Sequence, residues 1–291
     1  MARRWPAVFV LVLVAFAGCG GGDSSSSGDG GTTSSAPTPT GTTTDGTTTG
    51  TTSNRVGVKV YFLRGEQLGV AAREADTLAV ARAAAEALLA GPTVAERAAG
   101  LGTAIPRGTR LLGLSVANGT VTVDLSGEFD DGGGSASMLG RVAEIVATLT
   151  QFPGFERVAF RLDGEPVEAI GGEGVVVDPP IGREAIEGQT PAVLVESPAV
   201  GQTVTSPLRI SGTANTYEAT FQVSVTAAGG TELYRNFVTA TSGNGERGTF
   251  DESLELAEGA APGPITLTVW EDDADTGRRV NVVEIPLRLA R

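Results

Sequence analysis

Histidine is missing from all 291 residues of the chain, and cysteine occurs only once, as Cys19. Without histidine, the chain cannot use Ser-His-Asp or Cys-His catalysis, histidine metal ligation or histidine proton shuttling. A single cysteine excludes an intramolecular disulfide and a cysteine zinc site. We therefore predict no catalytic residues and no cofactor, and we expect a protein that is not an enzyme.

Basic residues are also scarce, with 21 Lys and Arg against 34 Asp and Glu, which gives a net charge of −13. Loss of the first 18 residues would remove Arg3 and Arg4 and no acidic residue, which makes the net charge −15. A chain with this charge is repelled by nucleic acid and by anionic lipid headgroups. Nucleic acid is therefore not an expected partner.

The N-terminal region contains one long apolar run, Ala7–Ala17, which follows the basic pair Arg3-Arg4. Its length is typical of a signal-peptide hydrophobic region and falls short of the roughly 20 residues that span a bilayer. The run leads into Gly18-Cys19, and this end resembles the lipobox of bacterial lipoproteins. The resemblance implies that residues 1–18 are a lipoprotein signal peptide and that acylated Cys19 anchors the chain on the extracytoplasmic face of the cell membrane. The alternative is an ordinary signal peptide, with Cys19 left as a free thiol.

Residues 19–53 consist of Cys19 followed almost entirely by Gly, Ser, Thr and Pro, with a few Asp. This composition cannot bury an apolar core, so we predict a disordered tether. A flexible coil of this length has an end-to-end distance on the order of 30 Å. The run Thr38-Pro39-Thr40 is of the kind that carries O-linked glycans, and a bare linker is the alternative.

A β-hairpin over residues 109–129 is the clearest element of the next segment. Asn118-Gly119 supplies the two positive φ angles that a type I′ turn needs. Counting outward along the strands places apolar residues in pairs on one face. The predicted pairs are Val116 with Val121, Leu114 with Val123 and Leu112 with Leu125.

Elements on both sides of the hairpin complete a first domain, which we place at residues 54–178. Alternation predicts strands at 56–63 and 157–162, and helical periodicity predicts helices at 77–90 and 136–150. Asp163-Gly164 then turns the chain back into a last short strand. The order predicts an α+β fold with two helices on a small mixed or antiparallel sheet.

Four motifs of this domain occur in order: Leu88–Thr93 (LLAGPT), Ile105–Thr109 (IPRGT), Val121–Ser126 (VTVDLS) and Thr148–Pro153 (TLTQFP). Together they resemble the sporulation and spore germination domain of GerMN type. The resemblance implies a non-catalytic α+β module related to domains of envelope assemblies, and it transfers no catalytic residues to this chain.

A second domain is predicted at residues 191–291, after a linker at 179–190 that contains Pro179-Pro180. Seven short strands with turn signals between them predict an all-β, immunoglobulin-like sandwich. The strands are expected at 192–196, 208–212, 220–226, 231–238, 248–256, 265–271 and 280–289.

The second domain also resembles a known family, the immunoglobulin-like domain of bacterial spore germination proteins. The residues that carry the resemblance are Ser197-Pro198, Gly201, Ser206–Leu208, Gly212–Ala214, Tyr217–Thr220, Phe250 and Leu254. In that family this domain often follows the GerMN-type domain in one chain, which is the order found here.

Three carboxylates in one turn, Glu271, Asp273 and Asp275, form the best candidate metal site. The turn fails the EF-hand pattern because glycine comes one place late and the twelfth position is valine. We therefore expect a solvated acidic turn, with weak calcium binding as the alternative.

Two further groups of residues invite a functional reading. Glu128, Asp130 and Asp131, beside a glycine run, contain enough carboxylates for acid–base chemistry, but a flexible loop is the simpler reading. Trp270 and Tyr217 are either exposed binding aromatics or partly buried residues at the edge of the sandwich.

The function predicted from these features is that of a non-enzymatic, lipid-anchored cell-envelope scaffold, assembly factor or interaction factor. Its expected partners are the membrane, through Cys19, and other envelope proteins or the cell wall. One alternative is a module that binds a cell-wall glycan or peptide, and another is a hydrolase that uses carboxylates alone. The oligomeric state stays open.

Overall fold

The computed structural model describes residues 55–76, 79–171 and 174–290, and they belong to one compact unit, residues 51–291. The signal peptide, Cys19 and the tether predicted for residues 1–53 lie outside the described residues. Among the described residues, no helix has the length and apolar character needed to cross a bilayer.

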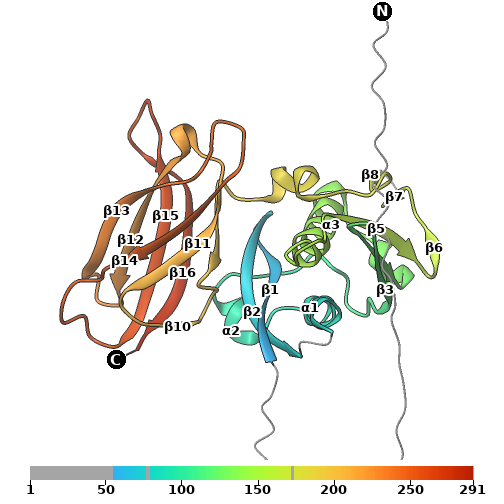
Figure 1. Ribbon diagram of the computed structural model, residues 1–291, viewed down its shortest axis with the longest axis horizontal. Coiled ribbons are helices and arrows are strands. Elements are labelled where there is room, and N and C mark those ends of the chain that lie inside the picture. The colour runs from blue at the N-terminus through green and yellow to red at the C-terminus, as the bar shows by residue number, and fades with distance from the viewer. Residues whose placement is uncertain (1–54, 77–78, 172–173, 291) are drawn as a thin grey trace, which may run out of the picture. The chain divides into compact units, whose positions relative to one another are not determined.

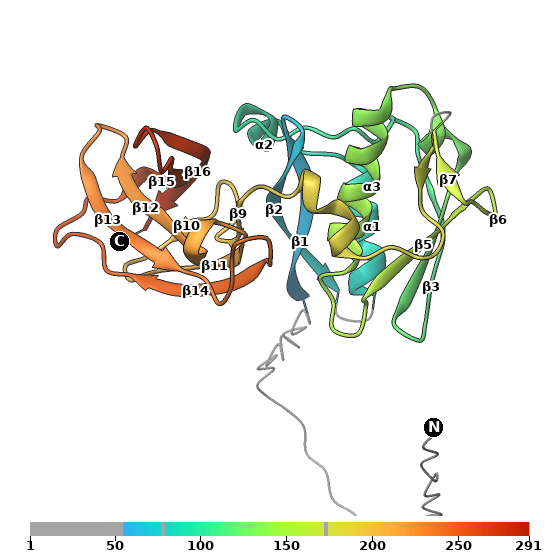
Figure 2. The ribbon, with the colours of Figure 1, turned by 90° about the horizontal axis from the view of Figure 1, so that it is seen from above.

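In the first domain, helices α1 and α3 lie between two layers of strands (Figures 1 and 2). One layer is the antiparallel hairpin β1–β2, and the other is a sheet with the order β3-β4-β5-β6. Helix α3 contacts β1 on one side and β5 on the other. The elements are β1 (Arg55–Arg64), β2 (Gln67–Asp76), α1 (Val80–Leu89), α2 (Val94–Ala98), β3 (Leu111–Ala117), β4 (Thr120–Leu125), η1 (Gly127–Asp130), α3 (Ser135–Leu149), β5 (Arg157–Leu162), β6 (Glu165–Pro166), β7 (Ala169–Ile170) and β8 (Val175–Val176).

The predicted α+β class is confirmed, and one difference concerns the number of sheets. The prediction placed strand 56–63 with the central hairpin and assigned no strand to residues 67–76. In the structure, the turn at Gly65, whose φ is +63°, brings β2 back along the whole length of β1. Because β1 pairs with β2, the two strands form their own sheet on the far side of the helices.

The central hairpin has the predicted turn and most of the predicted register. Asn118 and Gly119 have φ angles of 50° and 77°, as a type I′ turn requires. The pairs Val116–Val121 and Leu114–Val123 are confirmed. The pairing of Leu112 with Leu125 is wrong, because a bulge between Leu111 and Gly113 places Leu111 opposite Leu125.

Helix α3 connects β4 to β5, which pair in parallel. Its predicted apolar stripe is confirmed as buried: Met138, Val142, Ile145, Val146 and Leu149. Arg141, Glu144 and Thr148 lie outside that stripe and are also buried, because strands cover the helix on more than one side. The prediction had assumed one sheet, which would leave these polar residues at the surface.

Helix α2, which the prediction missed, begins with a capping box at Thr93. The Glu96 amide donates to the Thr93 hydroxyl (3.3 Å), and the Thr93 amide donates to the Glu96 carboxylate (2.8 Å). Arg73 donates to the same carboxylate, also at 2.8 Å. Burial opposes ionisation of Glu96, but Arg73 and the Thr93 bonds outweigh it and lower its pKa.

Replacement of Thr93 by alanine is expected to reduce the free energy of unfolding by about 1 kcal/mol, because the Glu96 amide loses its acceptor. Urea titration followed by circular dichroism would measure the loss. Arg82→Ala is the matched control, because its exposed pair with Glu86 is worth only about 0.3–0.5 kcal/mol. Equal effects of the two substitutions would contradict a stabilising cap.

The second domain is a sandwich of a three-stranded sheet, β14-β11-β9, and a five-stranded sheet, β10-β16-β15-β12-β13. All seven predicted strands are present, and the short β10 is an addition that pairs in parallel with β16. Phe221 and Phe250 meet edge to face in its core, with ring centres 4.9 Å apart. The elements of the sandwich, which follow η2 (Arg183–Gln189), are β9 (Val193–Ser197), β10 (Thr203–Val204), β11 (Leu208–Ala214), η3 (Tyr217–Ala219), β12 (Thr220–Ala227), β13 (Glu232–Thr239), β14 (Gly248–Leu254), β15 (Gly263–Asp272) and β16 (Arg279–Leu289).

The segment that we predicted as a linker, residues 179–190, is folded. It contains η2, a 3-10 helix that contacts α3, and Ile186 from this helix is buried in the core of the first domain. The chain therefore stays against the first domain until it enters β9.

Candidate functional site at the junction of the two domains

Strand β9 belongs to both domains because its two faces are both buried. Side chains alternate along a strand, so Val193 and Val195 point one way and Leu194 and Glu196 the other. Val193 and Val195 lie in the core of the sandwich, whereas Leu194 lies in the core of the first domain. The same side of β9 presents Glu196 to the first domain.

The Glu196 carboxylate is the centre of a charged cluster that crosses the junction. Lys59 and Tyr61, both on β1, donate to it from their side chains, each at 2.6 Å. Arg183 from η2 donates to it at 3.1 Å. The Glu196 carboxylate is therefore hydrogen-bonded to side chains from two separate segments, strand β1 of the first domain and η2, which packs on that domain.

Arg183 extends this cluster to the end of α3. Its guanidinium donates to the Thr150 hydroxyl (3.1 Å), the Ala147 carbonyl oxygen (3.1 Å) and the Tyr61 hydroxyl oxygen (3.2 Å). It also lies over the Tyr61 ring, 5.1 Å from its centre. A cation at the C-terminal end of a helix is favoured by the helix dipole, so α3 helps to hold Arg183 in place.

The electrostatics keep the cluster charged at neutral pH. Burial raises the pKa of Tyr61, and Glu196 raises it further, so the phenol stays protonated and can donate. Burial opposes ionisation of Glu196, but Lys59, Tyr61 and Arg183 outweigh that cost and lower its pKa. The pKa of Arg183 is raised, since its attraction to Tyr61 and Glu196 outweighs burial.

The motif Thr148–Pro153 provides the base on which this cluster is built. The β1 backbone is bonded to α3 at Tyr61, whose amide donates to the Thr148 hydroxyl (3.1 Å). Gln151 accepts from the Lys59 amide (2.9 Å) and donates to the Lys59 carbonyl oxygen (2.7 Å). These side chains fix the strand that carries both Lys59 and Tyr61.

A second polar pair, Arg141 and Glu144, is buried on α3, away from the junction. Arg141 donates to the backbone carbonyl oxygens of Ala104 (3.0 Å), Phe129 (2.6 Å), Asp131 (2.9 Å) and Gly132 (2.7 Å). Its guanidinium therefore holds together two loops of the first domain.

Glu144 lies one turn further along α3 and has no exposed surface. One of its oxygens accepts from the Ala104 amide at 2.9 Å, and the other, Oε1, has no hydrogen-bond partner among the described residues. Burial raises the pKa of Glu144 to about 8, against the opposing effects of the Ala104 amide, the Thr103 side chain, the Ile105 amide and Arg141.

The carboxylates of the candidate metal turn are used within the fold. Glu271 accepts from the Tyr217 amide (3.2 Å) and the Asn281 side chain (2.6 Å). Asp273 accepts from the amide and hydroxyl of Thr276, and Asp275 is exposed. Within residues 55–76, 79–171 and 174–290, no three His, Cys, Asp or Glu side chains are close enough to hold a metal ion.

The three acidic residues beside the glycine run make separate contacts. Glu128 forms an ion pair with Arg110 at 3.5 Å, and Asp130 accepts from the Gly171 amide. The backbone carbonyl of Asp131 binds Arg141. Two of the three carboxylates thus have structural contacts of their own, and Asp131 makes its contact through its backbone.

The two aromatic candidates differ in exposure. Trp270 is only 2% exposed, and the guanidinium groups of Arg235 and Arg279 lie over its ring, at 5.3 and 4.0 Å from the ring centre. Tyr217 is 70% exposed, and Phe237, which sequence reasoning did not single out, is 59% exposed.

Sequence reasoning also missed the junction itself. The available signal was that β9 reads Val-Leu-Val-Glu-Ser, with apolar residues on both faces, which favours a strand buried on both sides. A strand at the edge of an isolated sandwich would not need Leu194 on its outer face.

Comparisons with solved structures found likenesses below 25% identity. A candidate lipoprotein from Clostridium perfringens is 22% identical, with a TM-score of 0.35, over 47% of this chain and 93% of that one. The first GerMN domain of the sporulation protein GerM from Bacillus subtilis is 21% identical, with a TM-score of 0.37, over 44% of this chain and 98% of that one. The tandem GerMN domains of the same protein are 15% identical, with a TM-score of 0.41, over 69% of this chain and 61% of that one.

A comparison with curated proteins gave no match. Two family models match the chain. Residues 59–168 match Germane, described as sporulation and spore germination, and residues 192–278 match Gmad2, described as the immunoglobulin-like domain of bacterial spore germination. Neither description names a catalytic activity. The chain thus combines a domain of the GerMN-type sporulation and spore germination family with a domain of the immunoglobulin-like family of bacterial spore germination.

Proposed function

We propose that this protein is a non-enzymatic, lipid-anchored scaffold of the cell envelope that acts by binding other envelope proteins. Acylated Cys19 would hold it on the extracytoplasmic face of the membrane, and residues 20–53 would serve as its tether. The family of both domains supports a role in sporulation or germination.

The Glu196 cluster is the observation that carries this proposal. A scaffold must present its surfaces in a fixed relation, and flexible joints between domains work against that. Here Glu196 binds Lys59, Tyr61 and Arg183, and Leu194 shares the core of the first domain. The two domains can therefore act as one rigid binding unit, which suits assembly better than turnover of a substrate.

The proposal predicts that anchoring depends on Cys19. Wild-type protein produced in a bacterium with a lipoprotein-processing pathway is expected in the membrane fraction and labelled by a fatty-acid probe. The Cys19→Ser variant should lose the label and leave the membrane fraction. The control is Thr38→Ser, which changes the tether but leaves the cysteine. Equal labelling of wild type and Cys19→Ser would contradict the anchor.

Partner binding is tested by cross-linking in living cells, followed by isolation of the full-length protein. Wild type should recover a discrete set of envelope proteins, and Glu196→Ala should recover several-fold less at equal abundance. Glu184→Ala is the matched control, since its 3.4 Å pair with Arg157 is exposed. Recovery of cell-wall fragments without protein partners would contradict the scaffold.

A second candidate function, glycan or peptide binding, is favoured by Tyr217 and Phe237, which expose most of their side chains. Exposed aromatic side chains suit contact with apolar faces of a ligand. Cosedimentation with purified peptidoglycan tests this function. Tyr217→Ala and Phe237→Ala should then weaken binding, and Val116→Ala, which changes an exposed apolar residue of the first domain, should not.

A further inference from the structure

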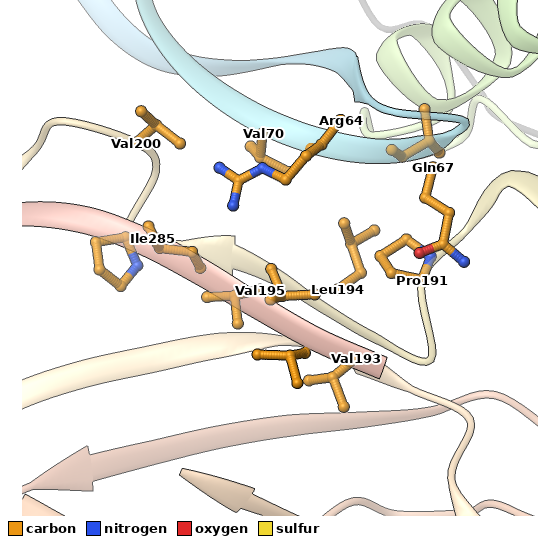
Figure 3. A pocket seen from close by; sticks show the side chains of 14 residues that line it. Arg64, Gln67, Val70, Pro191, Val193, Leu194, Val195, Val200 and Ile285 are labelled. Atoms are coloured by element: carbon orange, nitrogen blue, oxygen red, sulfur yellow. The ribbon is translucent and has the colours of Figure 1, made fainter. Parts of the chain in front are cut away.

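A cavity of about 150 Å³ lies beside the charged cluster, between the β1–β2 hairpin and strands β9 and β16 (Figure 3). Its walls are mainly aliphatic. They include Leu68, Val70, Val193, Leu194, Val195, Val200, Val283 and Ile285, together with Pro191 and Pro198. Gln67 and Val282 also line the cavity and are exposed, so the cavity is open to solvent on that side.

Arg64 is the only charged residue that lines this cavity. Figure 3 shows its guanidinium directed into the space where Val70, Val200 and Ile285 lie. One terminal nitrogen donates to the Glu284 carbonyl oxygen. The Nε atom is buried and has no hydrogen-bond partner, and Arg64 forms no ion pair within the part of the chain that the structure describes.

A buried donor without an acceptor in an apolar wall lowers the stability of the folded protein. Each buried group without a partner forfeits its solvation, and the loss is larger for a charged group. Burial lowers the pKa of Arg64, although Glu284 opposes this effect. An anion that entered the cavity would meet the Arg64 guanidinium in this apolar wall and form an ion pair with it.

The size of the cavity limits what that anion can be. Sites for drug-sized ligands occupy roughly 300–1,000 Å³, so 150 Å³ is too small for a nucleotide or a disaccharide. An apolar cavity of about 150 Å³ does accommodate a molecule of the size of benzene. The matching ligand therefore has about six or seven non-hydrogen atoms, an apolar body and one negative end.

We propose that this cavity binds a carboxylate carried by a short, branched aliphatic chain. Arg64 would donate to the carboxylate, and the valine and isoleucine side chains of β2, β9 and β16 would surround the hydrocarbon. A free short-chain acid presents this chemistry, and so does the C-terminal valine or leucine of a peptide. The proposal goes beyond the scaffold function and does not depend on the anchor at Cys19.

Isovalerate is the probe for the free acid, added to full-length protein with ¹³C-labelled methyl groups. Saturable shifts are expected at Val70, Val200 and Ile285, with a Kd of roughly 1 mM or below. Isovaleramide keeps the shape without the charge, and acetate keeps the charge without the chain. Both should bind at least tenfold more weakly.

Two variants test the assignment of Arg64 and of the cavity. Arg64→Gln should weaken isovalerate tenfold or more, whereas Arg110→Gln, a change of an exposed arginine, should leave the Kd unchanged. Val283→Phe should abolish binding by filling the space. Thermal unfolding of each variant establishes that it is folded, and Val283→Phe remains informative if Arg64→Gln does not fold.

The source of the carboxylate, a free short-chain acid or a protein C-terminus, is distinguished with a peptide that ends in valine. Its Kd is compared with that of isovalerate and with that of the same peptide as its C-terminal amide. Tighter binding of the acid peptide than of isovalerate would assign the site to a protein C-terminus, and the reverse would assign it to a free acid. The proposal is overturned if neither ligand shifts these methyl signals at 10-fold the expected Kd, if isovaleramide binds as well as isovalerate, or if Arg64→Gln leaves binding unchanged.

Discussion

The free energy of unfolding of the Glu196→Ala variant is expected to be about 2–3 kcal/mol lower than that of the wild type, between the effects of a surface ion pair and a fully buried one, because the Arg183 and Lys59 side chains are 35% and 37% exposed. The substitution leaves Arg183 partly buried without its carboxylate and removes the acceptor of Tyr61 and Lys59. A partly buried cation that has lost its partner retains part of its desolvation cost, so the effect exceeds that of a surface ion pair.

The thermal unfolding of this variant, measured by calorimetry, should also differ in the number of transitions. Wild type is expected to unfold in one transition, because Leu194 and Glu196 couple the two cores. In Glu196→Ala, two partly separated transitions are expected. Glu184→Ala should keep a single transition and lose less than about 1 kcal/mol. A variant that unfolds like the wild type would show that the cluster does not couple the domains.

The second large effect is a dependence on pH that comes from Glu144. Its pKa is raised from 4.5 to about 8 in the folded protein. The folded state therefore holds a proton that the unfolded state releases between these pH values, and the stability gained from this group at low pH is lost as pH rises toward 8.

Glu144→Gln removes this titration while keeping the shape and an acceptor for the Ala104 amide. At pH 5 the variant and the wild type should differ by less than about 1 kcal/mol. At pH 9 the variant should be more stable by roughly 2–5 kcal/mol, because the wild type must bury a charge. Urea unfolding at pH 5, 7 and 9 measures the difference.

Glu128→Gln is the control for this prediction, because Glu128 lies at the surface and its pKa is lowered instead, by hydrogen bonding to Ser126 and by its own backbone. At pH 9 the free energy of unfolding of Glu128→Gln should not exceed that of the wild type. If the stability of Glu144→Gln follows that of the wild type at all three pH values, Glu144 does not carry the proton.

Local patterns were enough to predict most elements of both domains. Asn118-Gly119 determines its turn through backbone sterics alone, and the stripe from Met138 to Leu149 identifies α3 by its period. The sandwich strands follow from alternation in the same way. These features depend on neighbours within one element, so the sequence displays them directly.

The junction could not be predicted because it depends on which surfaces meet. Glu144 and Thr148 look like residues of an exposed helix face, but the loop at Ala104 contacts Glu144 and strand β1 contacts Thr148, so both are buried. Arg183 lies in the segment 179–190. Because this segment begins with Pro179-Pro180, it was expected to be a linker. Glu196 is one of many acidic residues until β1 and η2 are placed around it.

The two-sided burial of β9 bears on how this pair of domains can evolve. Leu194 fills space in the first domain although it belongs to the chain of the second. A gene rearrangement that replaced the sandwich at its family boundary, near residue 192, would remove Leu194 and Glu196 together. The first domain would then expose an apolar gap and lose the counterion of Arg183. An exchanged sandwich that fits the first domain equally well therefore needs a first strand with a leucine and an acidic residue at these two positions.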